Sequence, residues 1–351
     1  MVNKGEVLAA LARVSDPELG KDVVSLGMVD DIDIQGGRVS FTLNLTTPAC
    51  PLRTRIEQGA RDEVSRLPGV KEVAMKTSSK VFATREYSQA EVLLGVKNVI
   101  AVASGKGGVG KSTLAVNLAV ALAASGAKVG ILDADVYGPN VPHMMGVHSD
   151  ATVKDGKIEP AVAFGVKVAS LGFFYKDETP LIWRGPLVAG AIRQLLTQVN
   201  WGELDYLVCD LPPGTGDSSL TLAQTVPLGG VVIVTTPQEA ALNIAAKALA
   251  MFRRLNVPIL GVVENMSYYT CPHCGERAYV FSSGGGRRIA AQLGADFLGE
   301  IPLNSSIREQ SDMGAPLVAA KPDAPESAAF KEFAFRVAGM VSIVAYSKAK
   351  K

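Results

Sequence analysis

The sequence predicts an α/β fold in which helices flank a mainly parallel sheet, preceded by a small α+β domain. After residue 96, short apolar runs recur: NVIAVAS, KVGILDAD, YLVCDLPP, GVVIVTTP and ILGVVENM. Longer helix-like segments such as STLAVNLAVALAASG lie between them. Near-continuous apolar strands separated by helices are typical of a parallel sheet that is buried on both faces. Ligands of such sheets bind at the carboxyl ends of the strands, so the functional residues are expected there.

The first part of the chain has a different pattern, which predicts the small α+β domain. Two runs of alternating apolar and polar residues, MVDDIDI and RVSFTLNLT, flank the pair Gly36 and Gly37, as the strands of a hairpin do. An apolar-periodic start, a helix-like ARDEVSRL and a strand KEVAMKT complete this domain. We expect a small domain at 1–80, a linker at 81–96, the α/β domain at 97–345 and a solvated tail at 346–351.

Composition narrows the classes of function. The chain has 35 basic and 34 acidic residues, so no overall field attracts nucleic acid or a membrane, and neither is an expected partner. The opening residues lack the apolar core of a signal peptide, and no apolar run approaches a membrane span, so we expect a cytoplasmic protein. Four cysteines are too few and too scattered for a disulfide framework, which leaves thiol chemistry or metal binding.

A phosphate-binding loop follows the first strand of the predicted parallel sheet. Residues 105–112 match G-x-x-x-x-G-K-[ST], between the strand VIAVAS and an apolar helix, which is the context that this motif requires. Main-chain N–H groups surround the phosphates, the lysine reaches the β and γ phosphates, and the serine binds Mg²⁺. The residues expected to bind ATP here are Gly105, Lys106, Gly107, Gly108, Val109, Gly110, Lys111, Ser112 and Thr113.

Three aspartates end two of the other predicted strands. Asp210 closes YLVCD and precedes the turn LPPGTGD, the position of a Walker B carboxylate that holds Mg²⁺. Asp133 and Asp135 are two residues apart and therefore share a face of their strand. We expect Asp133 to act on the water shell of the Mg²⁺ and Asp135 to orient the attacking water, the alternative being a solvated turn with a helix-capping aspartate.

The sequence CPHC places Cys271 and Cys274 in a C-x-x-C, and no second such pair exists. A tetrahedral Zn²⁺ or a four-iron cluster takes four protein ligands, so one chain offers half of a site. Four readings remain open: a redox pair, a zinc knuckle assisted by His273, a surface turn, and a metal centre shared by two chains. Of these, the knuckle within one chain is disfavoured, because the loop must also turn at His273.

Lys106 is the second lysine of GKGGVGKST, and taken alone it reads as a solvated surface residue. The loop, however, resembles the deviant Walker A loop of the MinD/ParA-type ATPases. In that class the additional lysine crosses a dimer interface and contacts the partner's nucleotide. The resemblance implies a MinD/ParA-like P-loop fold, a homodimer, and a role for Lys106 in sensing the γ-phosphate of the partner.

A more specific resemblance covers residues 95–340. The motifs GKGGVGKST, DADVYGPN, WRGP, DLPPGTGD, TTPQEAA, ENMS and CPHCG are similar to those of the Mrp (ApbC-type) iron-sulfur cluster carrier ATPases. The resemblance implies a slow, switch-like Mg-ATPase. It further implies that Cys271 and Cys274 of two subunits bridge a labile [4Fe-4S] cluster, taken from a donor and passed to apo-proteins. Relatives also suggest that Asn265 recognises adenine.

The first domain is similar to the accessory domain of SufT-like iron-sulfur assembly proteins, through DPELGKDVVSLGMV and LNLTTPACP. Cys50 matches the cysteine of that domain, and it is either a thiolate near a helix start or a buried small hydrophobe. Cys209 is expected in the core. Two rival functions remain: a positioning or partitioning ATPase, in which CPHCG has no role, and a dimer that zinc only staples, since four thiolates suit zinc and iron-sulfur alike.

Overall fold

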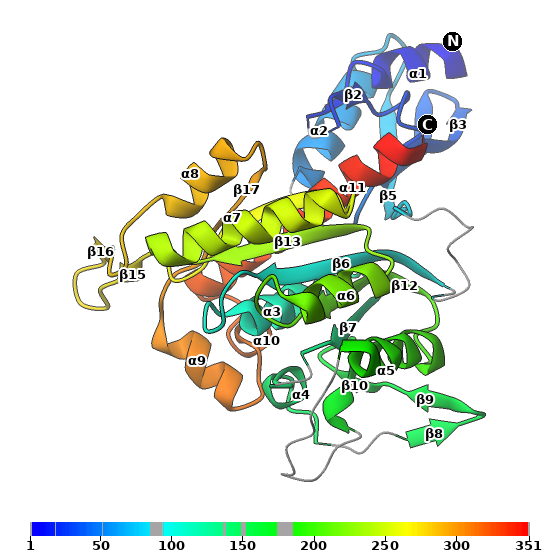
Figure 1. Cartoon of the computed structure of the whole chain (residues 1–351). Coiled ribbons are helices and arrows are strands. Elements are labelled where there is room, and N and C mark those ends of the chain that lie inside the picture. Colours follow the sequence, from blue (N-terminus) through cyan, green and yellow to red (C-terminus); the bar gives the residue numbers. More distant parts are fainter. Residues whose placement is uncertain are drawn as a thin grey trace. The chain divides into compact units, whose positions relative to one another are not determined.

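The computed structural model describes residues 2–17, 19–50, 52–84, 93, 95–135, 138–148, 152–173 and 185–349. The chain divides into two compact units, coloured along the sequence in Figure 1. Unit 1 is Met1–Phe82 with Ala338–Lys351, and unit 2 is Ala83–Val337. The greater part of the expected linker, residues 136–137 of DADVYGPN, 183–184 of WRGP and the last two lysines lie outside the described residues.

Unit 1 is the predicted α+β region. Its three-stranded sheet has the order β3-β4-β5, with β3 antiparallel and β5 parallel to β4. Alternate residues of β4 are buried, as the sequence pattern predicts, and the turn before it has glycines with positive φ at Gly36 and Gly37. The elements are α1 (Lys4–Leu11), β1 (Ser15–Asp16), β2 (Lys21–Asp22), β3 (Val29–Gln35), β4 (Arg38–Leu45), α2 (Arg53–Ser65) and β5 (Glu72–Ser79).

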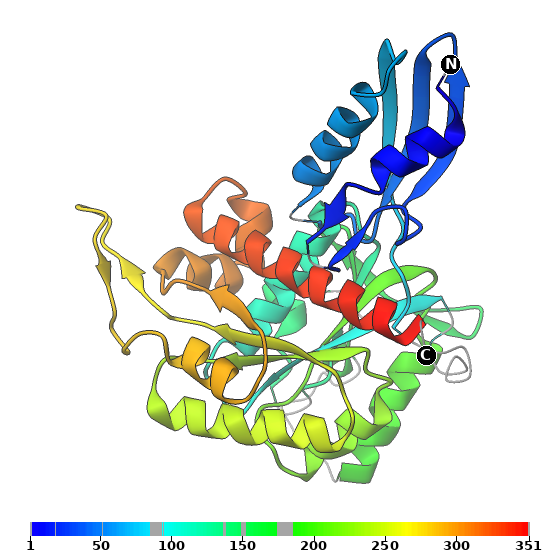
Figure 2. The same ribbon diagram turned by 90° about the horizontal axis from the view of Figure 1, so that it is seen from above.

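Unit 2 is built on an eight-stranded sheet of the order β10-β11-β7-β12-β6-β13-β14-β17. All neighbouring strands are parallel except β10, which pairs antiparallel with β11 at one edge. Helices lie on both faces, with α3 and α7 on opposite sides (Figure 2). This is the mainly parallel, helix-flanked sheet that the sequence predicts. The strands are β6 (Val96–Ser104), β7 (Val129–Asp133), β10 (Ala161–Ala163), β11 (Val166–Ser170), β12 (Leu204–Asp210), β13 (Gly230–Thr235), β14 (Ile259–Glu264) and β17 (Phe297–Glu300).

The remaining elements of unit 2 connect or extend this sheet. Two short antiparallel pairs, β8 (Thr152–Lys154) with β9 (Lys157–Glu159) and β15 (Tyr269–Thr270) with β16 (Arg277–Ala278), form small hairpins. A 3₁₀ turn covers Leu171–Phe173. The helices are α3 (Lys111–Ala124), α4 (Val141–Met144), α5 (Gly185–Gln198), α6 (Asp217–Thr225), α7 (Glu239–Arg254), α8 (Gly285–Gln292), α9 (Ser305–Asp312) and α10 (Leu317–Ala320).

The last helix extends into the expected tail. Helix α11 (Pro325–Ala349) continues through residues 346–349, which we expected to be a solvated tail. Its early residues Phe330 and Phe333 are buried, and near its end Tyr346 packs against the core of unit 1. Of the described tail residues, Tyr346 is half-buried whereas Ser347 and Lys348 are exposed, so this end of the chain is helical and still largely solvated. No helix in the described residues has the length and apolar content needed to cross a membrane.

Candidate nucleotide and thiol sites

The phosphate loop lies between the end of β6 and the start of α3. Gly108 and Gly110 have φ angles of 78° and 82°, a left-handed conformation that residues with a Cβ rarely adopt. At Gly105, a Cβ would lie 2.5 Å from the carbonyl carbon of Ile244, so only glycine fits there. The glycines of the motif are therefore required by the shape of the loop, which brings its N–H groups to the start of α3.

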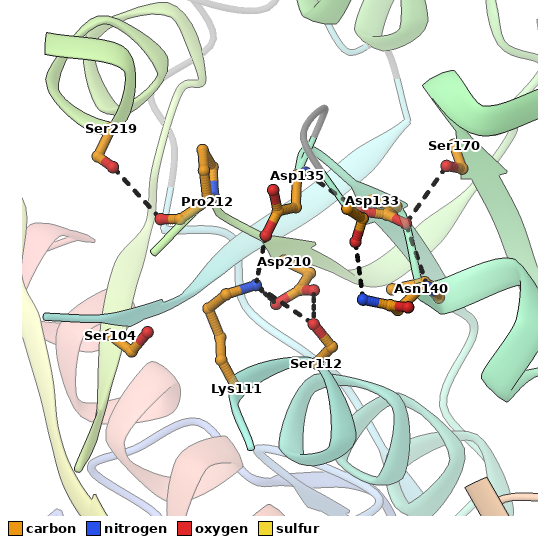
Figure 3. A network of polar contacts seen from close by, with 12 residues as sticks. Ser104, Lys111, Ser112, Asp133, Asp135, Asn140, Ser170, Asp210, Pro212 and Ser219 are labelled. Atoms are coloured by element: carbon orange, nitrogen blue, oxygen red, sulfur yellow. Dashed lines mark hydrogen bonds and ion pairs between the residues drawn. The ribbon is translucent and has the colours of Figure 1, made fainter. Parts of the chain in front are cut away.

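Lys111, Ser112 and Asp210 form a tight polar cluster at this loop (Figure 3). The Lys111 Nζ lies 2.6 Å from Asp210 Oδ1, and the Ser112 Oγ donates to Asp210 Oδ2 at 2.5 Å. Asp135 lies 3.7 Å from the same lysine. The Lys111 side chain is 6% exposed and that of Asp210 is 1% exposed, so solvent screens this ion pair little. The structure thus brings together the lysine, serine and aspartates that the sequence singles out.

Asp133 lies beside Asp210 but has a different environment. Its Oδ1 accepts from the Asp135 N–H at 3.1 Å, and its Oδ2 accepts from the Val141 N–H at 3.1 Å and the Ser170 hydroxyl at 3.3 Å. Burial, followed by the charge of Asp210, raises the pKa of Asp133 to about 7. Both oxygens thus hold the chain that follows β7, a geometry that favours a positioning role over the expected contact with the water shell of Mg²⁺.

Ser170 is a contributor that sequence analysis missed. It ends β11 and donates to Asp133, 37 residues earlier in the chain. No motif surrounds it. The only available signal is its place at the carboxyl end of a strand, which identifies a region of an α/β sheet and no particular residue.

Asn265 and Lys106, both near the phosphate loop, differ in their exposure to solvent. Asn265 is buried, and its Nδ2 donates to the Val109 carbonyl of the phosphate loop at 2.8 Å. A Cβ on Gly110 would lie only 2.1 Å from that nitrogen. The asparagine therefore supports the loop directly, while its predicted contact with adenine stays a prediction. Lys106 is exposed, as a residue that reaches another molecule must be.

Cys271 and Cys274 lie on the turn between β15 and β16, a hairpin that projects outward in Figure 2. The Gly275 N–H donates to the Cys271 carbonyl and the Cys271 N–H to the Glu276 carbonyl, both at 2.9 Å, which fixes the turn. Hydrogen bonds from the Cys274 and His273 main-chain N–H groups to its sulfur lower the pKa of Cys271. Cys271 is half-buried and Cys274 exposed, so both thiols are accessible.

The other two cysteines are buried. Cys209 belongs to the sheet core, as predicted, and burial followed by the Asp210 charge raises the pKa of its thiol. Cys50 is 8% exposed within the core of unit 1, which agrees with its reading as a small hydrophobe. Among the described residues, no three histidine, cysteine or acidic side chains are grouped so that they could hold a metal ion. The thiol pair of the hairpin is therefore two ligands, and four are needed for zinc or a four-iron cluster.

The parallel sheet, the glycine loop and the Lys111–Asp210 cluster define a P-loop nucleotide-binding protein. A family model described as NUBPL iron-transfer P-loop NTPase matches residues 95–338, and one described as iron-sulfur cluster assembly protein matches residues 4–75. The chain belongs to this family of iron-transfer P-loop NTPases and carries the assembly-protein domain before it. The predicted family and fold class are thereby confirmed.

Individual relatives agree with this assignment. The iron-sulfur cluster carrier protein of Synechocystis is 48% identical over 98% of this chain and 99% of its own length. The protein of the same name from Escherichia coli K12 is 45% identical over 80% of this chain and 76% of its own. Among solved structures, a nucleotide-binding protein of Archaeoglobus fulgidus in complex with ADP is 45% identical, with a TM-score of 0.58 over 64% of this chain and 89% of its own. The MinD cell division ATPase of Pyrococcus furiosus shares the fold, with a TM-score of 0.52, 22% identity and coverage of 68% of this chain and 98% of its own.

Proposed function

We propose that this chain is an ATP-dependent iron-sulfur cluster carrier that works as a homodimer in the cytoplasm. One observation carries the proposal: a complete phosphate loop and an accessible pair of thiols occur in the same unit, yet that pair supplies only half of a metal site. The names of the relatives, iron-sulfur cluster carrier proteins, support the same reading. A second copy of the chain supplies the missing ligands, and a [4Fe-4S] cluster is the cargo that fits four thiolates.

Nucleotide binding requires the buried ion pair to rearrange. Lys111 is neutralised by Asp210, whose Oδ1 lies 2.6 Å from its Nζ. An incoming triphosphate offers the lysine a stronger set of anionic partners and draws it away from Asp210. The oxygens of Ser112 and Asp210, already 2.5 Å apart, are hard ligands that fit Mg²⁺, which would neutralise phosphate charge there. Asp135 then faces the γ-phosphate region and orients the attacking water.

Lys106 links this site to the second subunit in the proposal. Its ammonium group contacts the γ-phosphate of the partner's nucleotide, so that ATP favours the closed dimer more than ADP does. Hydrolysis removes that contact and allows the dimer to open. Because the ATP is used to change state, we propose that hydrolysis is slow. A Lys106→Ala chain should bind ATP normally but lose ATP-dependent dimerisation; unchanged dimerisation would return the lysine to the solvated surface.

Anaerobic reconstitution with iron and sulfide tests the cargo. Wild-type chain should acquire iron and acid-labile sulfide in equal amounts, with the visible absorbance of a cluster, whereas Cys271→Ala should acquire neither. Cys50→Ala, which removes a buried thiol of unit 1, is the matched control and should load normally. A Cys271→Ala chain with a full cluster would contradict the proposal. Zinc bound without sulfide, even under reconstitution, would favour the zinc-stapled dimer instead.

A further inference from the structure

A polar cavity of about 230 Å³ lies along the edge of the sheet in unit 2, apart from the phosphate loop. All four residues of β17 line it, and Phe333 closes it from the side of α11. Three arginines, Arg277, Arg287 and Arg336, also line the cavity, as do two glutamates, Glu300 and Glu332. The cavity therefore combines an edge strand, apolar walls and an excess of guanidinium groups.

Two of these guanidinium groups have no acidic partner within the described residues. Arg336 pairs with Glu332 at 2.6 Å. Arg277 instead lies over the ring of Tyr268, 4.1 Å from its centroid, and Arg287 over the ring of Phe297 at 4.5 Å. Stacking on an aromatic ring fixes the plane of a guanidinium but leaves its N–H groups at the edge available. Such a fork is suited to bidentate binding of a carboxylate.

The strand at the floor of the cavity is also unpaired on one side. β17 ends the order of the eight-stranded sheet, so its only strand neighbour among the described residues is β14. Arg336 Nη1 donates to the Phe297 carbonyl of this strand at 3.4 Å, and the remaining main-chain donors and acceptors of the unpaired edge can bind an extended peptide that adds as one strand. A free small anion would use the arginines and leave this edge unused. The combination therefore favours a polypeptide over an isolated anion.

We propose that this cavity is a docking site for an extended acidic segment of a recipient polypeptide, which adds to β17 and places carboxylates on Arg277 and Arg287. The proposal rests on the carrier function proposed above. Arg277 directly pairs with Thr270 in the hairpin, and Thr270 adjoins Cys271. A segment docked here is thus held at the base of the hairpin whose turn carries the thiol pair. Docking would raise the effective concentration of the recipient's ligands at the cluster.

Exposed apolar residues next to the hairpin agree with a protein partner. Tyr279 and Val280 follow β16 and are 52% and 58% exposed. Large apolar side chains that project into solvent beside a charged cavity are typical of protein interaction sites. Covering them requires a ligand larger than a carboxylate.

Binding of a defined peptide tests the site without any cluster. The probe is a fluorescein-labelled eight-residue peptide of alternating valine and glutamate, titrated with the full chain and followed by anisotropy. We expect the double variant Arg277→Gln/Arg287→Gln to bind it at least about tenfold more weakly than wild type, because two charge-assisted contacts are lost. The matched control Arg288→Gln/Arg308→Gln loses the same charge from arginines that pair with surface acids outside the cavity and should bind normally.

Four further measurements separate the outcomes. A valine–glutamine peptide and an acidic peptide with N-methyl groups on alternate residues should both bind more weakly, since the first lacks carboxylates and the second cannot add as a strand. Equal affinity of wild type and the glutamine variant, or no effect of N-methylation, overturns the proposal. Displacement of the peptide by free glutarate at equal concentration would show a small-anion site and also overturn it. Arg277→Lys/Arg287→Lys keeps the charge but not the planar fork; it should bind more weakly than wild type, even if the glutamine variant unfolds.

Cluster transfer connects the site with the carrier function. The glutamine variant should load iron and sulfide and bind ATP as wild type does, yet transfer the cluster more slowly to an apo-acceptor fused to the acidic peptide. An acceptor fused to the valine–glutamine peptide should show no difference between the two chains. If neither chain loads a cluster, the carrier proposal fails, but the peptide titrations still decide whether the cavity binds an acidic strand.

Discussion

Replacing Lys111 with methionine leaves the buried carboxylates of the phosphate loop without their cation. The Lys111–Asp210 pair has side-chain exposures of 6% and 1% and an N–O distance of 2.6 Å. Breaking a buried pair by removing one partner costs about 3–5 kcal/mol, because the remaining charge stays desolvated. We therefore expect Lys111→Met to lower the free energy of unfolding of unit 2 by about 3–5 kcal/mol when it is measured without nucleotide at pH 8.

A second ion pair of nearly the same length supplies the control. Lys97 and Asp205 lie 2.7 Å apart, but the lysine side chain is 41% exposed and the aspartate 14%. Water screens that pair, so Lys97→Met should cost about 1 kcal/mol or less. Because the two pairs have nearly the same N–O distance, the difference between the stability costs of the two variants measures the effect of burial.

Tryptophan fluorescence during urea unfolding measures both variants. Of the two tryptophans, Trp201 is buried in the core of unit 2, so its fluorescence reports the unfolding of that unit. The cost of Lys111→Met should shrink at pH 6, roughly one unit below the pKa of about 7 of Asp133, because protonation of one buried acid then removes part of the repulsion. Equal costs for Lys111→Met and Lys97→Met would show that burial of the Lys111–Asp210 pair adds nothing to its effect on stability.

Three other predictions concern neighbouring groups. The pKa of Asp133 is raised from 3.8 to about 7, so the folded chain holds this proton more tightly than the unfolded chain does. The contribution of this proton to the free energy of unfolding is therefore full below about pH 4 and is lost as the pH rises to about 7. Asp133→Asn should therefore remove roughly 4 kcal/mol of the change in unfolding free energy between these two pH values, measured by tryptophan-monitored urea titrations. An unchanged pH dependence would show that another group titrates in this range. Gly110→Ala should abolish binding of a fluorescent ATP analogue, since its Cβ would lie 2.1 Å from the Asn265 amide nitrogen. Gly126→Ala is the control, because Gly126 also has a positive φ, 99°, but no atom lies within 4 Å of the added Cβ. That variant should be similarly strained in its backbone and still bind the analogue. Asn265→Ala should weaken that same binding by loosening the phosphate loop, and an unaltered affinity would show that the hydrogen bond to Val109 is dispensable.

Sequence reasoning could group Lys111, Ser112 and Asp210 because each is defined by a loop motif or by the end of a strand. The loop motif occupies consecutive positions, and Asp210 closes a strand whose neighbour is the strand before the loop. Parallel register alone then brings Asp210 close to Lys111 and opposite Asp133. Residues defined by a strand end could thus be found from the pattern of strands and helices.

Other features depend on contacts between distant segments, which one sequence does not reveal. The orientation of Asp133 is set by Val141 and by Ser170 on another strand. The Asn265 amide meets Val109, 156 residues away. The length of α11 likewise depends on the core that Tyr346 meets in unit 1.

Native mass spectrometry of the anaerobically reconstituted chain tests the shared cluster most directly. We expect every cluster-bearing species to contain two chains and one [4Fe-4S] unit, with the pairs of Cys271 and Cys274 as ligands. Mixing wild type with a Cys271→Ser/Cys274→Ser chain should give mixed dimers that carry no cluster. A single chain that holds a cluster, or a mixed dimer that holds a complete one, would contradict the account.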